Sequence, residues 1–274
     1  MTSREDVLPA LEQYYDTAPR AGGARAEDFG PLTLFVQEGD GWPYYARPTL
    51  GSQAPVTADD VLRVLERQRE LGVPQAFEWV AETTPGLRAA VEAAGLPVHV
   101  HPLMVLDPAV EPEVPAVDAE VRLLGADDPL VHAAVTVPML AFAAPGTASG
   151  PAGPAELVAK MAEDPDNARC AHVLPKLADG RTALAAAFED GVALCSGQYV
   201  PVGPVAEVVA VGTLPAARRR GLGLAVTAAL VADARAKGAA VVFLSAGDED
   251  VARIYGRAGF RRVGTALIAE PADA

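Results

Sequence analysis

The sequence has few of the residues that build metal sites and disulfide frameworks. Its 274 residues include two cysteines and four histidines. Cys170 and Cys195 form no metal-ligand spacing, and two cysteines are too few for a disulfide framework. Both lie in apolar stretches, which indicates buried thiols. We therefore expect no metal.

Basic residues are also scarce. The chain has 22 Lys and Arg against 36 Asp and Glu, a formal net charge of −14. Such a surface repels phosphates, which argues against a nucleic-acid partner or an anionic membrane. It would attract a cationic partner, but it also serves solubility alone, and both interpretations stay open.

Long apolar runs are absent. No stretch of about 18 apolar residues could span a bilayer, and no apolar run follows the opening MTSREDVLP. Half of the residues are nevertheless hydrophobic and only 21% are charged, which is enough to build a buried core. We expect a cytoplasmic protein that does not act at a membrane.

A proline-rich segment divides the chain. DPAVEPEVPAVD, residues 107–118, has no hydrophobic period, which is typical of an extended linker. We place one domain at residues 1–112 and another at residues 119–274, with residues 113–118 as the linker between them. The length is comfortable for two domains of ordinary size.

The second domain has the pattern of an α/β fold. An Asp190-Gly191 pair between two apolar runs predicts a hairpin over residues 182–202. The valine-rich strand 205–214 follows, then a helix that closes on Gly238, a buried strand over 240–246, a short helix to Gly259 and a last strand. This order puts residues 216–223 at the carboxyl end of a strand and the amino end of a helix, where such folds bind anions.

The first domain shows a weak echo of the second. With an offset of 164 residues, FEWV (77–80) aligns with VVFL (241–244), and AVEAAGL (90–96) with IYGRAGF (254–260). The capped helix that ends at Gly72 corresponds to the one that ends at Gly238. We expect two similar mixed sheets flanked by helices, although repeated helices with closing glycines could produce part of this echo.

Three arginines stand directly before a Gly-Leu-Gly, at residues 218–223. A helix start leaves backbone N–H groups unpaired, glycines allow close approach, and arginines pair with phosphate oxygens, so the segment fits a pyrophosphate site. A plain turn before a solvated helix explains the same letters. No Gly-Lys-Ser/Thr follows, which excludes a P-loop, and the dinucleotide fingerprint is also missing.

The context of this segment resembles the GCN5-related N-acetyltransferase (GNAT) family. RRRGLG fits that family's Gln/Arg-x-x-Gly-x-Gly/Ala motif, the preceding VGTLP its cofactor strand, and IYGRAGF the signature of its later helix. The resemblance spans most of residues 119–270. It implies two tandem GNAT-like domains, the first a degenerate copy without the glycine motif that binds no acyl-CoA.

The resemblance implies acetyl-CoA as co-substrate and a set of binding residues. The strand would offer backbone groups to the pantetheine arm and the acetyl carbonyl, and the segment after it would wrap the pyrophosphate. Asp248 stands where many members have an asparagine, and an ionised carboxylate cannot donate a hydrogen bond, so a helix N-cap explains it equally well. The expected cofactor-binding residues are Val211, Gly212, Thr213, Arg218, Arg219, Arg220, Gly221, Leu222, Gly223, Leu224 and Asp248.

The chemistry requires a neutral amine and a proton for the leaving thiolate. An aliphatic amine has a pKa near 10 and needs a base at neutral pH. Glu207 is the candidate base, since it stands on the strand where some members keep a catalytic glutamate. A place at the wet start of the strand would equally explain it. Tyr255 is the candidate acid, in the position from which members protonate the coenzyme A sulfur.

Three interpretations therefore remain. The first is an acetyl-CoA-dependent N-acetyltransferase that acts on a primary amine of a small molecule or peptide by direct attack in a ternary complex. The same fold could instead serve another acceptor, such as a thiol-sugar conjugate or a protein N-terminus. The second is a non-catalytic acyl-CoA-binding module, and the third is a purely structural glycine turn. The residues do not decide between a monomer and a homodimer.

Overall fold

The computed structural model describes residues 4–38 and 43–271. Its contacts form two compact units. The C-terminal unit is Met104–Arg261, and the N-terminal unit consists of the residues up to Leu103 and those from Arg262 onward. The borders fall inside the strands β5 (Val98–Leu106) and β11 (Phe260–Ala269). The domain limits at residues 112 and 119 stay a prediction.

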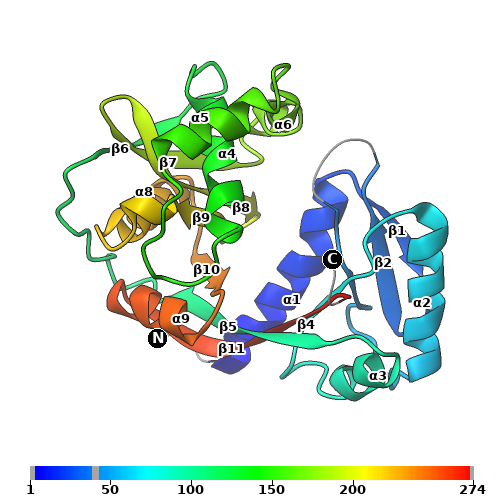
Figure 1. Ribbon diagram of the computed structural model, residues 1–274. Helices are drawn as coiled ribbons and strands as arrows, with labels where there is room; N and C mark the ends of the chain where they lie inside the picture. Colours follow the sequence, from blue (N-terminus) through cyan, green and yellow to red (C-terminus); the bar gives the residue numbers. More distant parts are fainter. Residues whose placement is uncertain (1–3, 39–42, 272–274) are drawn as a thin grey trace. The chain divides into compact units, whose positions relative to one another are not determined.

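The C-terminal unit is a mixed sheet between helices (Figure 1). Its strands β6, β7, β8 and β9 form antiparallel pairs in chain order, and β10 joins β9 in parallel. The elements are β6 (Glu120–Leu124), α4 (Val131–Phe142), α5 (Pro154–Ala162), α6 (Ala168–Ala171), α7 (Leu174–Ala178), β7 (Ala183–Glu189), β8 (Val192–Val202), β9 (Val205–Thr213), the 3₁₀ turn η1 (Pro215–Ala217), α8 (Leu222–Ala236), β10 (Val241–Ser245) and α9 (Glu249–Arg257).

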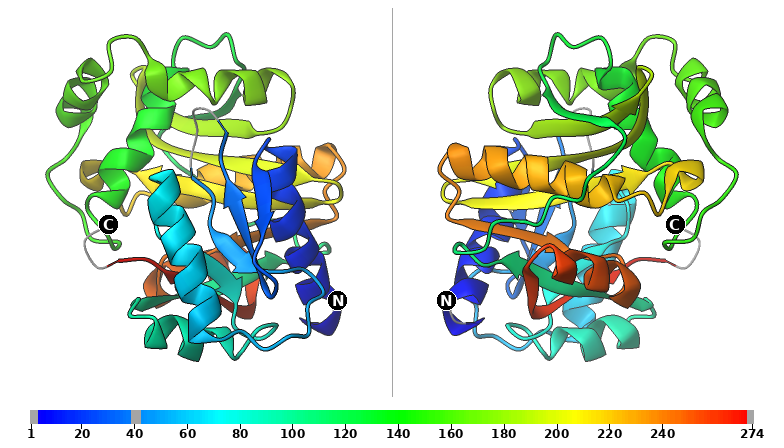
Figure 2. Two further views of the ribbon diagram at one scale, coloured as in Figure 1. Left: turned by 90° about the vertical axis from the view of Figure 1, so that its right-hand side faces the viewer. Right: turned by 90° about the vertical axis from the view of Figure 1, so that its left-hand side faces the viewer.

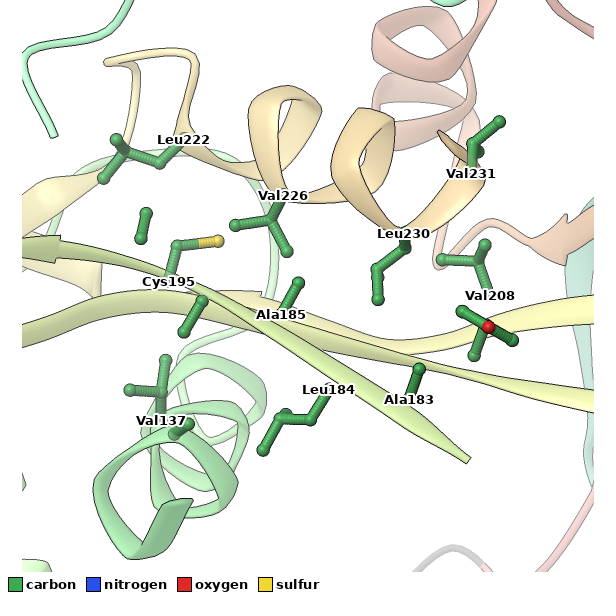
Figure 3. Packing of buried hydrophobic residues seen from close by; sticks show 14 of the residues in the cluster. Val137, Ala183, Leu184, Ala185, Cys195, Val208, Leu222, Val226, Leu230 and Val231 are labelled. Carbon is green, nitrogen blue, oxygen red and sulfur yellow. The ribbon is translucent and has the colours of Figure 1, made fainter. Parts of the chain in front are cut away.

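The helices α4 and α8 cover opposite faces of this sheet. Figure 3 shows Leu222, Val226 and Leu230 of α8 packed on one face and Val137 of α4 on the other. Small side chains let both helices approach closely, because Ala183 to Ala187 supply four alanines to β7 and all are buried. This packing fixes the start of α8 at the end of β9.

The N-terminal unit repeats the same order of elements. β1, β2 and β3 form antiparallel pairs, and β3 joins β4 in parallel after α2, just as β9 joins β10 after α8. The internal echo in the sequence is therefore a repeated topology. The elements are α1 (Arg4–Ala21), β1 (Arg25–Asp28), β2 (Leu32–Val36), β3 (Ala46–Pro48), α2 (Ala58–Leu71), β4 (Phe77–Val80), α3 (Leu87–Ala93) and β5.

The last strand of each repeat contributes to the other unit. β11 pairs antiparallel with β4, from Ala266↔Val80 to Ala269↔Phe77, within the N-terminal unit. The end of β5 lies in the C-terminal unit, next to β10, and Met104 and Leu106 are buried in that unit's core. No pattern in the sequence indicated this exchange, since the local pattern of a strand does not identify the strand with which it pairs.

Local signals explain most of the boundaries. Asp190 and Gly191 both have positive φ, 49° and 78°, as a two-residue hairpin turn of type I′ requires. α2 begins with a capping box between Thr57 and Asp60 and ends at Gly72, which takes the left-handed conformation. These turns and caps were expected from the sequence.

The linker, residues 107–118, is extended and contacts the C-terminal unit. The guanidinium of Arg235 on α8 donates hydrogen bonds to the carbonyls of Val110 (2.8 Å) and Asp107 (2.9 Å). Farther along, Pro115 and Val117 lie against Gly221 at the start of α8. Residues 107–118 therefore run along α8 from its end to its start, a course that Figure 2 also shows.

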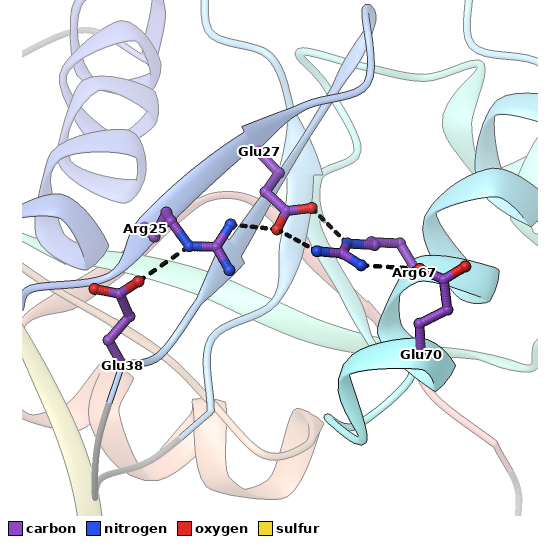
Figure 4. Close-up of polar contacts among 5 residues, drawn as sticks. All are labelled: Arg25, Glu27, Glu38, Arg67 and Glu70. Carbon is purple, nitrogen blue, oxygen red and sulfur yellow. Dashed lines mark hydrogen bonds and ion pairs between the residues drawn. The ribbon is translucent and has the colours of Figure 1, made fainter.

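A chain of ion pairs ties β1 to α2 in the N-terminal unit (Figure 4). The carboxylate of Glu27 binds Arg25 on its own strand and accepts from Arg67 on α2 at 2.8 Å, while Glu38 and Glu70 bind the outer sides of the two arginines. The hydrogen bonds from Arg67 and Arg25 hold the pKa of Glu27 at about 2. This network is structural.

Within residues 4–38 and 43–271, no helix is both long enough and apolar enough to cross a bilayer.

Candidate active site

The strand β9 carries an irregularity that opens one side of the sheet. Its register against β8 shifts between Ser196↔Gly212 and Gln198↔Val209, so β9 has one extra residue there, and Ala210 takes a left-handed conformation with φ 54°. The parallel pairing of β9 with β10 ends at Phe243↔Glu207, before this bulge. Beyond that pair, β9 continues to Thr213 without pairing with β10. We call the place where these two strands part the gap.

The loop that follows β9 forms the start of α8. We call residues 214–221 the arginine–glycine loop. Arg219 and Gly221 have φ of 65° and 80°, and Gly221 is the N-cap of α8. In this helix the N–H of Ala225 bonds to the Gly221 carbonyl, whereas the first N–H groups of any helix have no partner within it. The loop thus presents backbone donors and the positive end of the helix dipole.

Space at this helix start suits a bound phosphate group. A Cβ placed on Gly223 would meet only the Thr213 hydroxyl, at 3.7 Å. Gly221 is more crowded, because its Cβ would lie 3.2 Å from Pro115 and 3.4 Å from Val117 while the backbone is left-handed. The residues present therefore fit the pyrophosphate of coenzyme A, with Gly223 facing the more open space.

The three arginines of the motif differ in what they contact. Arg218 donates to four main-chain carbonyls, among them those of Ala141 (2.8 Å) and Ala148 (3.0 Å). Arg220 pairs with Glu189 at the hairpin tip, at 2.6 Å, and lowers the pKa of that carboxyl. Arg219 is exposed and has neither a hydrogen bond nor an ion pair with any residue that the structure describes. Arg219 is thus the available cation.

Tyr255 lies on α9 and faces α8. Its hydroxyl lies near that of Thr227, which itself donates to the Gly223 carbonyl at 2.8 Å. Loss of hydration raises the pKa of Tyr255 to about 12, although the Thr227 hydroxyl acts in the opposite direction. The phenol therefore keeps its proton at neutral pH and can donate a hydrogen bond.

Cys195 lies near the same place and is inert. Its thiol is buried and accepts a hydrogen bond from the Thr213 hydroxyl at 3.2 Å. Burial raises the pKa of Cys195 to about 12, so it is no thiolate at neutral pH. The expected interpretation as a buried structural thiol agrees with this geometry, and Cys170 is buried as well.

Glu207 lies at the last register pair between β9 and β10. Its neighbour Val208 points toward α8 (Figure 3), and successive side chains of a strand alternate between faces. Glu207 therefore lies on the face that α4 covers, whereas Tyr255 lies on the α8 side. The two candidate catalytic residues therefore lie on opposite faces of the sheet.

The other expected residues lie at the ends of β9, α8 and α9. Asp248 is the N-cap of α9 and accepts from the Val251 N–H at 2.8 Å, which is the alternative its sequence context left open. Val211, Gly212 and Thr213 form the end of β9, and Leu222 and Leu224 lie in the first turn of α8. Among the described residues, no group of three His, Cys, Asp or Glu side chains could hold a metal ion.

Sequence reasoning missed Thr227, the bulge at Ala210 and the role of Arg218 in the fold. A threonine four residues after Gly223 was a usable signal for Thr227, because residues i and i+4 share a helix face. No sequence signal indicates the left-handed conformation of Ala210, since alanine rarely takes a positive φ. The contacts of Arg218 depend on α4, which is distant in the sequence.

Part of the chain is similar in sequence to a known protein family. Residues 155–260 match the model of the Acetyltransferase (GNAT) family. No match is found among the curated proteins.

Solved structures share the fold over most of the chain. A GCN5-related N-acetyltransferase from Kribbella flavida is 24% identical with a TM-score of 0.61, over 93% of this chain and 95% of that one. A tandem GNAT protein from the clavulanic acid biosynthesis pathway is 15% identical with a TM-score of 0.57, over 92% and 86%. A GCN5-related N-acetyltransferase-like protein from Streptococcus suis is 12% identical with a TM-score of 0.53, over 90% and 88%.

The matched residues lie within the C-terminal unit and mark it as a GNAT-type acetyltransferase domain. Residues 155–260 thus match the GNAT acetyltransferase family, and the chain shares its fold with GNAT proteins, a tandem GNAT protein among them.

Proposed function

We propose that this protein is an acetyl-CoA-dependent N-acetyltransferase whose active site lies in the C-terminal unit. The observation that carries the proposal is the join of β9 and α8. There a bulged strand with an unpaired edge runs into a helix start that offers Gly223, backbone N–H groups and the unpaired Arg219. The pyrophosphate would bind at the helix start and the pantetheine arm along Val211 to Thr213.

Two side chains are proposed to carry the chemistry. Glu207 would take the proton of the amine on the α4 side of the gap, and the neutral amine would attack the thioester carbonyl directly. Tyr255 would hold the departing sulfur on the α8 side. Because its pKa of about 12 exceeds that of an ordinary thiol, it stabilises the thiolate through a hydrogen bond more readily than by giving up its proton.

The test is a thiol-release assay with acetyl-CoA and a panel of primary amines, amino sugars and short peptides. An N-acetyltransferase releases coenzyme A only with an acceptor, and Glu207→Gln and Tyr255→Phe reduce the rate while acetyl-CoA still binds. Tight binding without turnover for any acceptor would instead favour the non-catalytic module. Release only with a thiol-bearing sugar conjugate would identify the other acceptor class.

The N-terminal unit is proposed to bind no acyl-CoA. Its counterpart of α8 is α2, which begins at Ala58 behind the side-chain cap Thr57. That capping box satisfies two of the backbone N–H groups at the helix start, and no arginine–glycine segment precedes it. A stoichiometry of one acetyl-CoA per chain is therefore expected.

A further inference from the structure

Arg218 is surrounded by acceptors that belong to the protein itself. Its Nη2 donates to the carbonyls of Ala141 and Ala144 at 2.8 and 2.6 Å, Nη1 to Ala148 at 3.0 Å, and Nε to Thr213 at 3.4 Å. Ala141 lies in the last turn of α4 and Ala144 just beyond it, where the helix dipole favours a positive charge. A phosphate that drew Arg218 away would break these four hydrogen bonds.

Two of these carbonyls, those of Ala144 and Ala148, belong to the connection between α4 and α5, residues 143–153, which we call the α4–α5 loop. Main-chain bonds join it to the arginine–glycine loop, from the Gly150 N–H to the Pro215 carbonyl (3.1 Å) and from the Ala216 N–H to the Ala152 carbonyl (2.9 Å). Gly153 allows the close approach, since its Cβ would lie 3.2 Å from the Cβ of Ala216. The two loops therefore pack as one body.

This body lies on the face of the sheet from which an amine would reach Glu207. A Cβ on Gly212, beyond the bulge of β9, would lie 2.8 Å from the Cβ of Ala141, so the end of α4 packs directly on the strand beside the gap. An acceptor that approaches on this side meets the α4–α5 loop. The position of that loop thus bears on the acceptor more than on the coenzyme.

We propose that Arg218 is a positioning residue for the acceptor: its side chain fixes the α4–α5 loop on the arginine–glycine loop and does not bind the phosphates of the coenzyme. The inference rests on the proposed N-acetyltransferase function and assigns different tasks to two neighbouring arginines. Arg219, which is exposed and unpaired, takes the phosphate. Arg218 connects the coenzyme loop to the acceptor side.

The test compares Arg218→Gln with Arg219→Gln, which remove the same charge from adjacent positions. Acetyl-CoA affinity is measured by calorimetry, amide hydrogen exchange is followed over residues 143–153, and kcat and KM are determined with the most active amine of the panel. We expect Arg219→Gln to weaken acetyl-CoA binding about tenfold and leave the exchange of the loop unchanged.

Arg218→Gln should show the opposite pattern. Acetyl-CoA affinity stays within about twofold, exchange over residues 143–153 becomes faster, and the amine KM rises about tenfold. Arg218→Lys, which keeps the charge without the planar fork, should fall between Arg218→Gln and the unmodified protein and serves if the glutamine variant does not fold. Weaker acetyl-CoA binding with unchanged loop exchange would overturn the proposal.

Failure of the proposed function is distinguishable from failure of this inference. If the unmodified protein binds no acetyl-CoA, the N-acetyltransferase proposal falls, and hydrogen exchange alone decides the role of Arg218. Faster exchange over residues 143–153 in Arg218→Gln would then support the anchor, and unchanged exchange would overturn it.

Discussion

The hydroxyl of Tyr255 on α9 lies near that of Thr227 on α8, and Thr227 in turn donates a hydrogen bond to the Gly223 carbonyl at 2.8 Å. This pair connects the candidate acid to the helix start proposed to bind the pyrophosphate. The phenol is thereby oriented by the same helix that would hold the coenzyme.

Tyr255→Phe should lower kcat about 100-fold and leave acetyl-CoA affinity within about twofold, since it removes only the hydroxyl that is proposed to hold the departing sulfur. With its pKa near 12, Tyr255 stays protonated, so the pH–rate profile of the unmodified protein should show no fall from this group below about pH 10. Steady-state kinetics from pH 6 to 10 check both points.

The matched control is Tyr199→Phe. Tyr199 is buried and donates a hydrogen bond to Asp233 at 2.7 Å, away from the gap. Its loss should reduce the free energy of unfolding by about 1–2 kcal/mol and leave kcat unchanged. Equal losses of kcat in the two variants would contradict the assignment of Tyr255.

Glu207→Gln should reduce turnover at pH 7 and recover part of it as the pH rises toward the pKa of the amine. A neutral amide cannot accept the proton, but at high pH more of the amine is already neutral. The pH dependence of kcat/KM for the amine measures this. Glu120→Gln, an exposed glutamate on β6, is the control and should leave the profile unchanged. A uniform loss at every pH would contradict a role as base.

Leu106→Ala should destabilise the protein by about 3 kcal/mol, although Leu106 precedes the linker. It is buried, and its side chain belongs to the core of the C-terminal unit. Urea unfolding measures the change. Leu62→Ala on α2 is the control, since Leu62 is 44% exposed and should cost less than about 1 kcal/mol. Equal unfolding midpoints would contradict the exchange of strands between the repeats.

The Glu27 network predicts a loss of stability in acid. The pKa of Glu27 in the folded protein is about 2, below the value in an unfolded chain. The folded state therefore binds fewer protons, and the stabilisation is present above about pH 5 and lost as the pH falls toward 2. Glu27→Gln should lower the urea midpoint at pH 7 and lose this difference near pH 3.

Glu38→Gln is the control for this network, because Glu38 is 61% exposed and binds only the outer side of Arg25. It should change the midpoint little at any pH. A gap between Glu27→Gln and the unmodified protein that stays constant from pH 7 to 3 would contradict the low pKa.

The sequence predicted what local chemistry decides. The Asp190-Gly191 turn, the closing Gly72 and Gly238, and the glycine segment at the start of α8 all stand where expected. Helix α1 was not predicted, because Pro9 and Pro19 lie inside it and disfavour a helix pattern. Tertiary packing can outweigh such local signals against a helix.

Long-range contacts were beyond the sequence. The pairing partners of β5 and β11 depend on which sheet edge each strand reaches, and the sequence patterns of the two strands do not distinguish these edges. The three arginines also read alike, yet Arg218 binds carbonyls, Arg220 binds Glu189 and Arg219 binds neither. The sequence could place the candidate site but could not divide the tasks within it.

The most direct test of the account is a calorimetric titration with acetyl-CoA of the unmodified protein, Gly223→Asp and Gly86→Asp. Gly223 faces open space at the start of α8, and Gly86 stands at the start of α3 in the other unit with nothing near its Cβ position, so both variants add the same charge at a helix start. The account predicts one site per chain, lost in Gly223→Asp and kept in Gly86→Asp. Two sites, or undiminished binding by Gly223→Asp, would contradict the assignment of the site to the C-terminal unit, and no binding by the unmodified protein would contradict the acetyl-CoA-dependent function itself.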